Sequence, residues 1–142
     1  MKLATGVDLI EIERIERILE RHGDSFLSRI YTQRERELLG ENAEEIAARF
    51  AAKEAVSKAL GTGIGPVTWR EIETLRDKAG APVLYLHGKA KQLSDRLGLE
   101  TWSLSLSHTE TYALAFVVAI GIDSSTCGVT SNIIPCSGSR QI

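Results

Sequence analysis

The segment Arg49-Phe-Ala-Ala-Lys-Glu-Ala-Val-Ser-Lys58 belongs to a long helix around which we expect the chain to fold. Asn42 is a favourable N-cap, and Glu45, three residues later, completes a pattern similar to a capping box. The helix reaches Leu60 and should end in Gly61-Thr-Gly-Ile-Gly65-Pro66, because glycine can adopt a positive φ and proline cannot continue a helix.

The polar residues of this helix share much of one surface. At about 100° per residue, the wheel places Arg49, Lys53 and Ser57 in one i, i+4, i+8 ladder. Glu54 lies beside Ser57, and Lys58 lies one turn beyond Glu54. Three cations, a hydroxyl and a carboxylate together would suit a polyphosphate ligand with a divalent cation. The alternative is a solvated face with an ordinary Glu54–Lys58 pair.

Asp8 is a second candidate for a metal ligand. We expect a short strand over residues 3–7 and a helix from Ile10 to about His22, closed by Gly23. A carboxylate at the end of a strand is well placed to bind a cation, but it could equally be the N-cap of the following helix.

The remaining pattern mixes helices with antiparallel hairpins, which indicates the α+β class. Residues 68–76 and 83–87 alternate like a hairpin, residues 88–97 form a short amphipathic helix, and residues 102–107 and 112–120 form two more strands. The last strand shows little polar alternation. We therefore expect both of its faces to be covered, one of them by a second subunit.

The composition excludes several classes of protein. The 142 residues carry a formal net charge of −2, which gives no global attraction to nucleic acid or to an acidic membrane. The longest apolar run, Tyr112 to Ile120, is too short to span a membrane, and Asp8 interrupts any signal peptide. We expect a cytoplasmic protein. Cys127 and Cys136 lack the spacing of a zinc site.

Three segments resemble the holo-acyl-carrier-protein synthase family when they are taken in order. They are Gly6 to Ile15, Arg49 to Gly65, and Ser105-Leu-Ser-His-Thr109 with Tyr112, and the similarity spans roughly residues 3–121. The resemblance implies a small α+β 4′-phosphopantetheinyl-transferase-like fold, with an antiparallel sheet and a long helix. It also implies a homotrimer with interfacial active sites. We expect a transferase domain over residues 1–122 and a polar tail of unassigned role over residues 123–142.

The family's reaction moves 4′-phosphopantetheine from coenzyme A to a serine of apo acyl carrier protein, in fatty acid biosynthesis, and releases adenosine 3′,5′-bisphosphate. By position, Asp8 and Glu54 would bind Mg²⁺ and, with Lys58, carry the chemistry. The resemblance implies a further set of coenzyme A contacts: Arg49, Phe50, Ser57, Lys58, Gly61, Gly63, His108 and Thr109, with Lys53 as an additional candidate. The glycines could instead only cap the helix, and His108 could be a hydrogen-bonded turn residue.

A basic stripe follows one arc of the first helix, opposite its apolar arc. If the partner is an acidic carrier protein, this stripe would steer its approach. The proposed docking residues are Arg14, Arg17 and Arg21, with Ile18 and Phe26 as apolar anchors. The alternative is a solvated helix whose arginines are offset by neighbouring glutamates, Glu13–Arg17 among them.

Two other functions would use parts of this pattern. One is a different metal-dependent enzyme acting on nucleotide diphosphates, such as a hydrolase. The other is a non-catalytic module that docks an acidic helical protein, which would need the arginine stripe but not Asp8 and Glu54 together.

Overall fold

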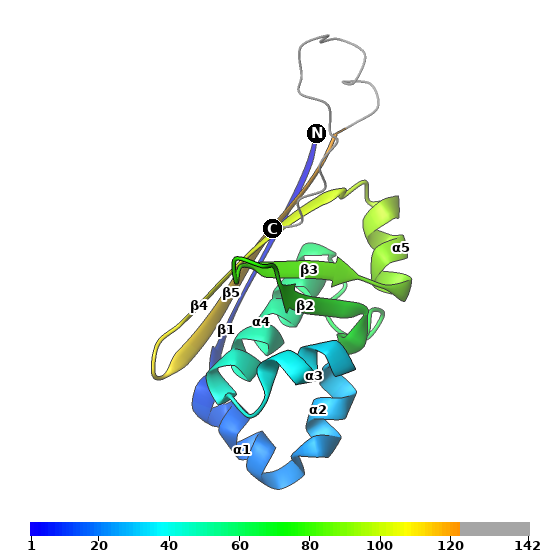
Figure 1. The fold of residues 1–142 in the computed structure, drawn as a ribbon. Coiled ribbons are helices and arrows are strands. Elements are labelled where there is room, and N and C mark those ends of the chain that lie inside the picture. The colour runs from blue at the N-terminus through cyan, green and yellow to red at the C-terminus, as the bar shows by residue number, and fades with distance from the viewer. Residues whose placement is uncertain (123–142) are drawn as a thin grey trace.

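The computed structural model describes residues 1–122, so the expected tail, residues 123–142, lies outside the described residues. Figure 1 shows a three-stranded sheet along one side of the long helix α4, with the smaller elements on the other side. The elements in chain order are β1 (Lys2–Glu11), α1 (Ile12–His22), α2 (Asp24–Ile30), α3 (Gln33–Leu39), α4 (Ala43–Ala59), a 3₁₀ turn (Trp69–Glu71), β2 (Ile72–Arg76), β3 (Pro82–Leu86), α5 (Gly88–Arg96), β4 (Thr101–His108) and β5 (Tyr112–Gly121).

Two antiparallel sheets confirm the α+β prediction. The larger sheet has the order β1-β5-β4, with β5 in the middle, and the smaller one is the β2-β3 hairpin. The expected hairpin, the helix near residues 88–97 and the last two strands are all present. Asn42 caps α4, as predicted, by accepting a hydrogen bond from the Glu45 N–H at 3.1 Å. No helix of the described part is long and apolar enough to cross a membrane.

The core lies between β1, β5 and α4, which approach each other closely. Side chains alternate along a strand, so Ala113, Ala115, Val117 and Ala119 of β5 all point into the core. A Cβ on Gly6 would lie 1.8 Å from the carbonyl oxygen of Ala55 on α4. Glycine at this position therefore sets the distance between β1 and α4.

The first strand is longer than expected, and this changes the place of Asp8. β1 continues to Glu11 because Ile10 pairs with Ala113 of β5 and is buried. α1 begins only at Ile12, so Asp8 is neither at the strand end nor an N-cap. Asp8 lies inside β1 opposite Ala115, two residues from Gly6, on the face that packs against α4.

Two short helices that the sequence pattern does not predict, α2 and α3, lie between residues 24 and 39. Thr32 begins α3 with a capping box that it forms with Glu35. The Phe26 ring packs edge-on against Tyr31, with centroids 6.1 Å apart, and only 4% of Phe26 is exposed. The prediction that Phe26 is an apolar anchor for a partner is therefore wrong, because the ring belongs to the core.

Glu73, on β2, connects α3 to the hairpin. It accepts hydrogen bonds from Thr32 Oγ1 at 2.5 Å and pairs with His87 Nε2 at 3.1 Å. Burial on its own would raise the pKa of Glu73, but these two partners and Arg34 outweigh it, and the pKa lies below its ordinary value.

The outer face of the large sheet is apolar and exposed in this single chain. Leu3, Val7 and Leu9 of β1 lie beside Leu114 and Phe116 of β5 on that face, and Leu9 is 60% exposed. Within one chain only the inner face of β5 is covered, so the expected cover of its outer face by a second subunit stays a prediction. A contiguous exposed apolar patch of this kind is typical of a protein interface.

Candidate functional site

Lys58 and Asp8 form an ion pair that joins α4 to β1. Lys58 Nζ lies 3.0 Å from Asp8 Oδ1 and also donates to the carbonyl oxygen of Val7 at 3.0 Å. Half of the Lys58 side chain is exposed. Among residues 1–122, Lys58 therefore pairs with a residue fifty positions away rather than with Glu54, the i, i−4 partner that the helical wheel offered.

Glu54 stands close enough to Asp8 for their charges to interact. Burial raises the pKa of Glu54, the Asp8 carboxylate raises it further, and Lys58 and Arg14 act in the opposite direction. Two carboxylates whose charges repel each other favour a hard divalent cation, which would relieve that repulsion. Among residues 1–122, no group of three or more His, Cys, Asp and Glu side chains is arranged to hold a metal ion. A pair of carboxylates alone is the donor set typical of Mg²⁺, which retains several waters.

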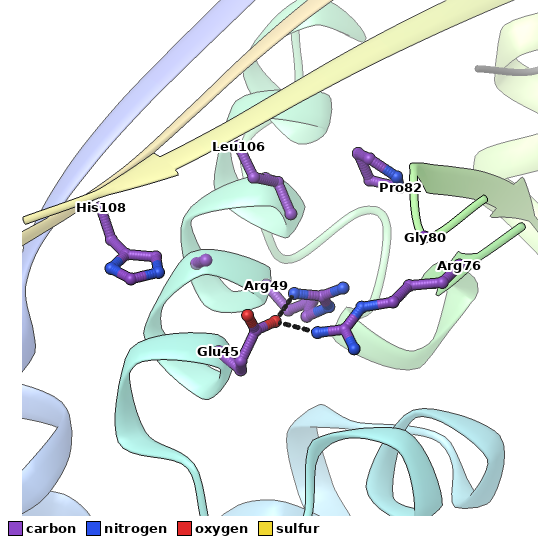
Figure 2. A pocket seen from close by; sticks show the side chains of 8 residues that line it. Glu45, Arg49, Arg76, Gly80, Pro82, Leu106 and His108 are labelled. Carbon is purple, nitrogen blue, oxygen red and sulfur yellow. Dashed lines mark hydrogen bonds and ion pairs between the residues drawn. The ribbon is translucent and has the colours of Figure 1, made fainter.

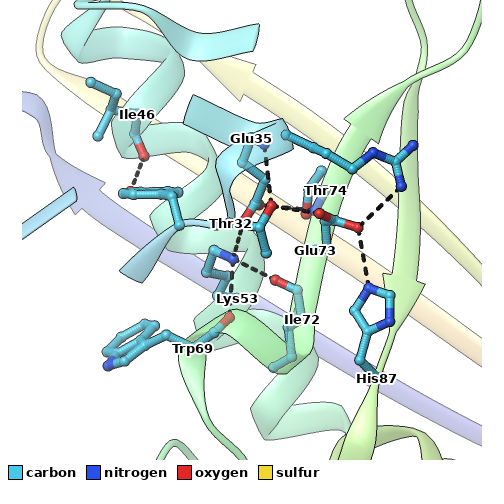
Figure 3. Close-up of polar contacts among 11 residues, drawn as sticks. Thr32, Glu35, Ile46, Lys53, Trp69, Ile72, Glu73, Thr74 and His87 are labelled. Atoms are coloured by element: carbon cyan, nitrogen blue, oxygen red, sulfur yellow. Dashed lines mark hydrogen bonds and ion pairs between the residues drawn. The ribbon is translucent and has the colours of Figure 1, made fainter. Parts of the chain in front are cut away.

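The ladder of Arg49, Lys53 and Ser57 on α4 is turned towards the interior of the chain. Lys53 is fully buried and donates to Glu35 Oε1 at 2.7 Å, to the carbonyl oxygen of Trp69 at 3.0 Å and to that of Ile72 (Figure 3). Glu35 completes this network by accepting from the Thr74 N–H at 3.0 Å. Lys53 is therefore a structural cation, and its assignment as a coenzyme A contact is corrected.

Ser57 and Phe50 are also packed inside the chain. Ser57 is fully buried, and its hydroxyl donates to the Glu54 carbonyl oxygen at 2.7 Å. The Phe50 ring stacks on Trp69 with centroids 4.8 Å apart. Both side chains are held by contacts within the chain in this arrangement, and their roles as coenzyme A contacts stay predictions.

The glycine segment after α4 does close the helix. Gly61 and Gly63 have φ values of 80° and 65°. The Gly61 N–H donates to the Lys58 carbonyl oxygen at 3.0 Å, and the Gly63 N–H donates to that of Ser57 at 3.2 Å. Capping therefore accounts for both glycines, and any contact with a ligand would be additional to it.

A pocket of about 460 Å³ lies beside the first half of α4 (Figure 2). One oxygen of Glu45 pairs with Arg49 Nη1 and also with Arg76 Nη2, the latter at 2.5 Å. Arg49 Nε is buried and has no hydrogen-bond partner among residues 1–122. The lining residues are Glu45, Ala48, Arg49, Arg76, Gly80, Pro82, Leu106 and His108. Sequence reasoning missed Glu45 and Arg76 as site residues, since Arg76 comes from the distant hairpin.

His108 and Thr109 lie at the end of β4, exposed, as the strand turns towards β5. His108 Nδ1 lies 3.5 Å from Glu44 Oε2. Thr109 Oγ1 accepts hydrogen bonds from the N–H groups of Thr111 and Tyr112 at 3.2 and 3.0 Å. Thr109 thus stabilises the turn, while His108 lines the same pocket as Arg49.

The basic stripe lies on the exposed surface of α1, near the two carboxylates. Arg17 pairs with Glu13 at 2.7 Å, and both side chains are about two-thirds exposed, as the solvated-helix alternative expects. Ile18 is half-buried and packs against the core. Arg14 is close enough to Glu54 to oppose the rise of its pKa, which places one end of the stripe near the Asp8–Glu54 pair.

The chain is similar to known proteins over nearly all of its described length. The family model described as the 4′-phosphopantetheinyl transferase superfamily matches residues 4–117. The holo-[acyl-carrier-protein] synthase of Herpetosiphon aurantiacus is 48% identical over 126 residues, which cover 84% of this chain and 99% of the relative. The relative from Koribacter versatilis, which has the same name, is 48% identical over 122 residues, covering 83% and 98%.

The solved structures agree in fold. The Helicobacter pylori holo-[acyl-carrier-protein] synthase in complex with coenzyme A aligns with a TM-score of 0.76 at 34% identity, covering 82% of this chain and 99% of that one. The corresponding synthase from Neisseria meningitidis aligns with a TM-score of 0.75 at 38% identity, covering 82% and 97%.

Proposed function

The chain belongs to the 4′-phosphopantetheinyl transferase superfamily, and from this premise we propose that Asp8, Glu54 and Lys58 form its reacting centre. The protein transfers the 4′-phosphopantetheine group from coenzyme A to a serine of apo acyl carrier protein and releases adenosine 3′,5′-bisphosphate. The observation that carries the assignment of the centre is the convergence of two carboxylates and one ammonium group from β1 and α4.

The chemistry requires a serine oxygen to attack the β-phosphorus of coenzyme A while the bond to the bridging oxygen breaks. Transfers of this kind depend mainly on positioning and on neutralising charge. Lys58 is half exposed and held in place by Asp8 and the Val7 carbonyl, so its ammonium can offset the charge of the leaving phosphate. The serine proton needs an acceptor, and Glu54, acting through a water, can serve because burial and the Asp8 carboxylate raise its pKa.

A divalent cation fits the same two carboxylates. Asp8 and Glu54 would hold Mg²⁺, with water completing its coordination shell. Their carboxylate oxygens are hard donors, and a cation between them would relieve the repulsion of their negative charges. When bound, the ion would neutralise diphosphate oxygens.

The rest of coenzyme A would be held by the Arg49–His108 pocket and by the backbone at Gly61 and Gly63. Arg49 supplies a guanidinium with an unpaired buried Nε, and His108 lies at the rim. Both groups suit a phosphate.

A trimer with interfacial sites, as the family resemblance implies, would cover the exposed apolar face of β1 and β5. Light scattering should then give three times the chain mass at micromolar concentration, and a monomer mass would contradict this proposal. We propose a cytoplasmic enzyme whose acidic carrier protein docks on Arg14, Arg17 and Arg21. The transferase domain would be residues 1–122.

Mass spectrometry of the carrier protein tests this function. Apo acyl carrier protein incubated with the enzyme, coenzyme A and Mg²⁺ should gain one phosphopantetheine arm. A carrier in which alanine replaces the accepting serine should gain nothing. A hydrolase would instead cleave coenzyme A and leave the carrier mass unchanged, and that result would contradict the proposal.

A further inference from the structure

The pocket beside α4 already contains an anion that belongs to the protein. The Glu45 carboxylate lies between the guanidinium groups of Arg49 and Arg76, and one of its oxygens pairs with both (Figure 2). Arg49 is on the same helix, one turn further on, and Arg76 is at the end of β2. Two guanidinium groups that converge on one oxygen form a site for a doubly charged anion.

The carboxylate satisfies this site only in part. Arg49 is 3% exposed, and its Nε is buried with no hydrogen-bond partner in the described part of the chain. Burial lowers the pKa of Arg49, and Glu45 only partly offsets this effect. A phosphate monoester offers three oxygens and close to two negative charges, whereas a carboxylate offers two oxygens and one. A phosphate therefore complements the two arginines better than Glu45 does.

The Glu45 carboxylate can move away from the two arginines and still have its charge stabilised. Its side chain is about a quarter exposed, and it lies in the first turn of α4, where the helix dipole favours a negative charge. Asn42 caps this turn through the backbone N–H of Glu45, so the helix end does not depend on the carboxylate. The pocket volume, about 460 Å³, is within the usual range of roughly 300–1,000 Å³ for small-ligand sites.

We propose that Glu45 is a built-in competitor of the ligand: it occupies the anion position between Arg49 and Arg76 in the free protein and gives it up to the 3′-phosphate of coenzyme A. This inference rests on the proposed function, which supplies the ligand. Coenzyme A carries its anionic charge on the diphosphate, assigned above to the Asp8–Glu54–Lys58 centre, and on the 3′-phosphate, which leaves the latter for the arginine pair. Glu45 thus weakens binding and helps the bisphosphate product to dissociate.

Calorimetric titration of the intact protein with two nucleotides tests the competition. Adenosine 3′,5′-bisphosphate carries the 3′-phosphate, and adenosine 5′-monophosphate lacks it. Glu45→Gln keeps the side-chain size and removes the competing charge, so the bisphosphate Kd should fall by about 1.5- to 5-fold, the range expected for losing a partly exposed ion pair. The monophosphate Kd should not change. Glu41→Gln, an exposed charge just before α4, should change neither.

Three outcomes would overturn the inference. If Glu45→Gln binds the bisphosphate more weakly, Glu45 orients the arginines instead of competing. If the gain is equal for both nucleotides or is also seen in Glu41→Gln, the effect is general electrostatics. If the bisphosphate does not bind wild type, the arginine pair is not its site. The competition and the proposed function can also be told apart. If Glu45→Gln binds only the bisphosphate more tightly and the wild-type protein transfers no phosphopantetheine to the carrier protein, the competition is supported and the proposed function is contradicted.

Discussion

Replacing Lys53 by methionine should destabilise the protein strongly, because it breaks an ion pair that is completely shielded from water. Methionine nearly preserves the volume but removes the ammonium that binds Glu35 and two carbonyl groups. Both side chains are 0% exposed. Removing one partner of a buried pair costs about 3–5 kcal/mol, because the other charge remains buried without compensation. This is a large part of a typical unfolding free energy of about 5–15 kcal/mol.

The matched control is an ion pair of the same length on the surface. Lys91 Nζ lies 2.7 Å from Asp95 Oδ1, and both side chains are more than half exposed. Lys91→Met should cost less than about 1 kcal/mol. The measurement is urea unfolding followed by circular dichroism, at one fixed protein concentration, since association would make the midpoint depend on concentration.

A double variant separates the charge from the packing. Lys53→Met with Glu35→Leu removes both charges, and it should be more stable than Lys53→Met alone, because a buried apolar pair avoids the unpaired carboxylate. The reasoning would be refuted by a Lys53→Met protein within about 1 kcal/mol of wild type, particularly if it bound coenzyme A more weakly. That result would return Lys53 to the ligand site.

Three further predictions follow from other parts of the fold. Gly6→Ala should prevent folding, because the added Cβ would lie 1.8 Å from the Ala55 carbonyl oxygen, and soluble expression with a wild-type melting temperature would contradict the packing described. The lowered pKa of Glu73 means that its contribution to stability is present above about pH 4.5 and is lost as the pH falls through its folded pKa; Glu73→Gln should therefore be less stable at pH 7 and lose less on acidification to pH 3, as thermal melts will show. Arg14→Glu with Arg21→Glu should lower kcat/KM for the carrier protein and flatten its salt dependence, whereas parallel salt curves would leave the stripe a solvated helix face.

Local patterns in the sequence were sufficient for most of the fold. The cap at Asn42, the alternation along residues 68–76 and 83–87, and the apolar run of the last strand are each short-range signals, and each element is present. The two short helices α2 and α3 were missed because they have seven residues each, too few for a clear period. The end of β1 was misplaced because pairing with β5 extends the strand beyond its local preference.

The site was harder to predict because a helical wheel shows which residues share a face but not what covers that face. Arg49, Lys53 and Ser57 do share one face of α4, yet Glu35 and the hairpin cover its middle. Glu54 and Lys58, by contrast, are not covered and remain at the surface beside β1. In both cases, residues far away in the sequence determine whether this part of the helix is buried or open to a ligand.

The most direct test of the central claim compares Glu54→Gln with Glu37→Gln, an exposed charge on α3. The mass shift of apo acyl carrier protein is measured with coenzyme A and saturating Mg²⁺, and the melting temperature of each variant is recorded. Glutamine keeps the shape of Glu54 but removes the charge that a hard cation and the reacting centre require. We predict no phosphopantetheine transfer by Glu54→Gln at an unchanged melting temperature, and full transfer by Glu37→Gln. Transfer by Glu54→Gln at the wild-type rate would contradict the assignment of the reacting centre to Asp8, Glu54 and Lys58.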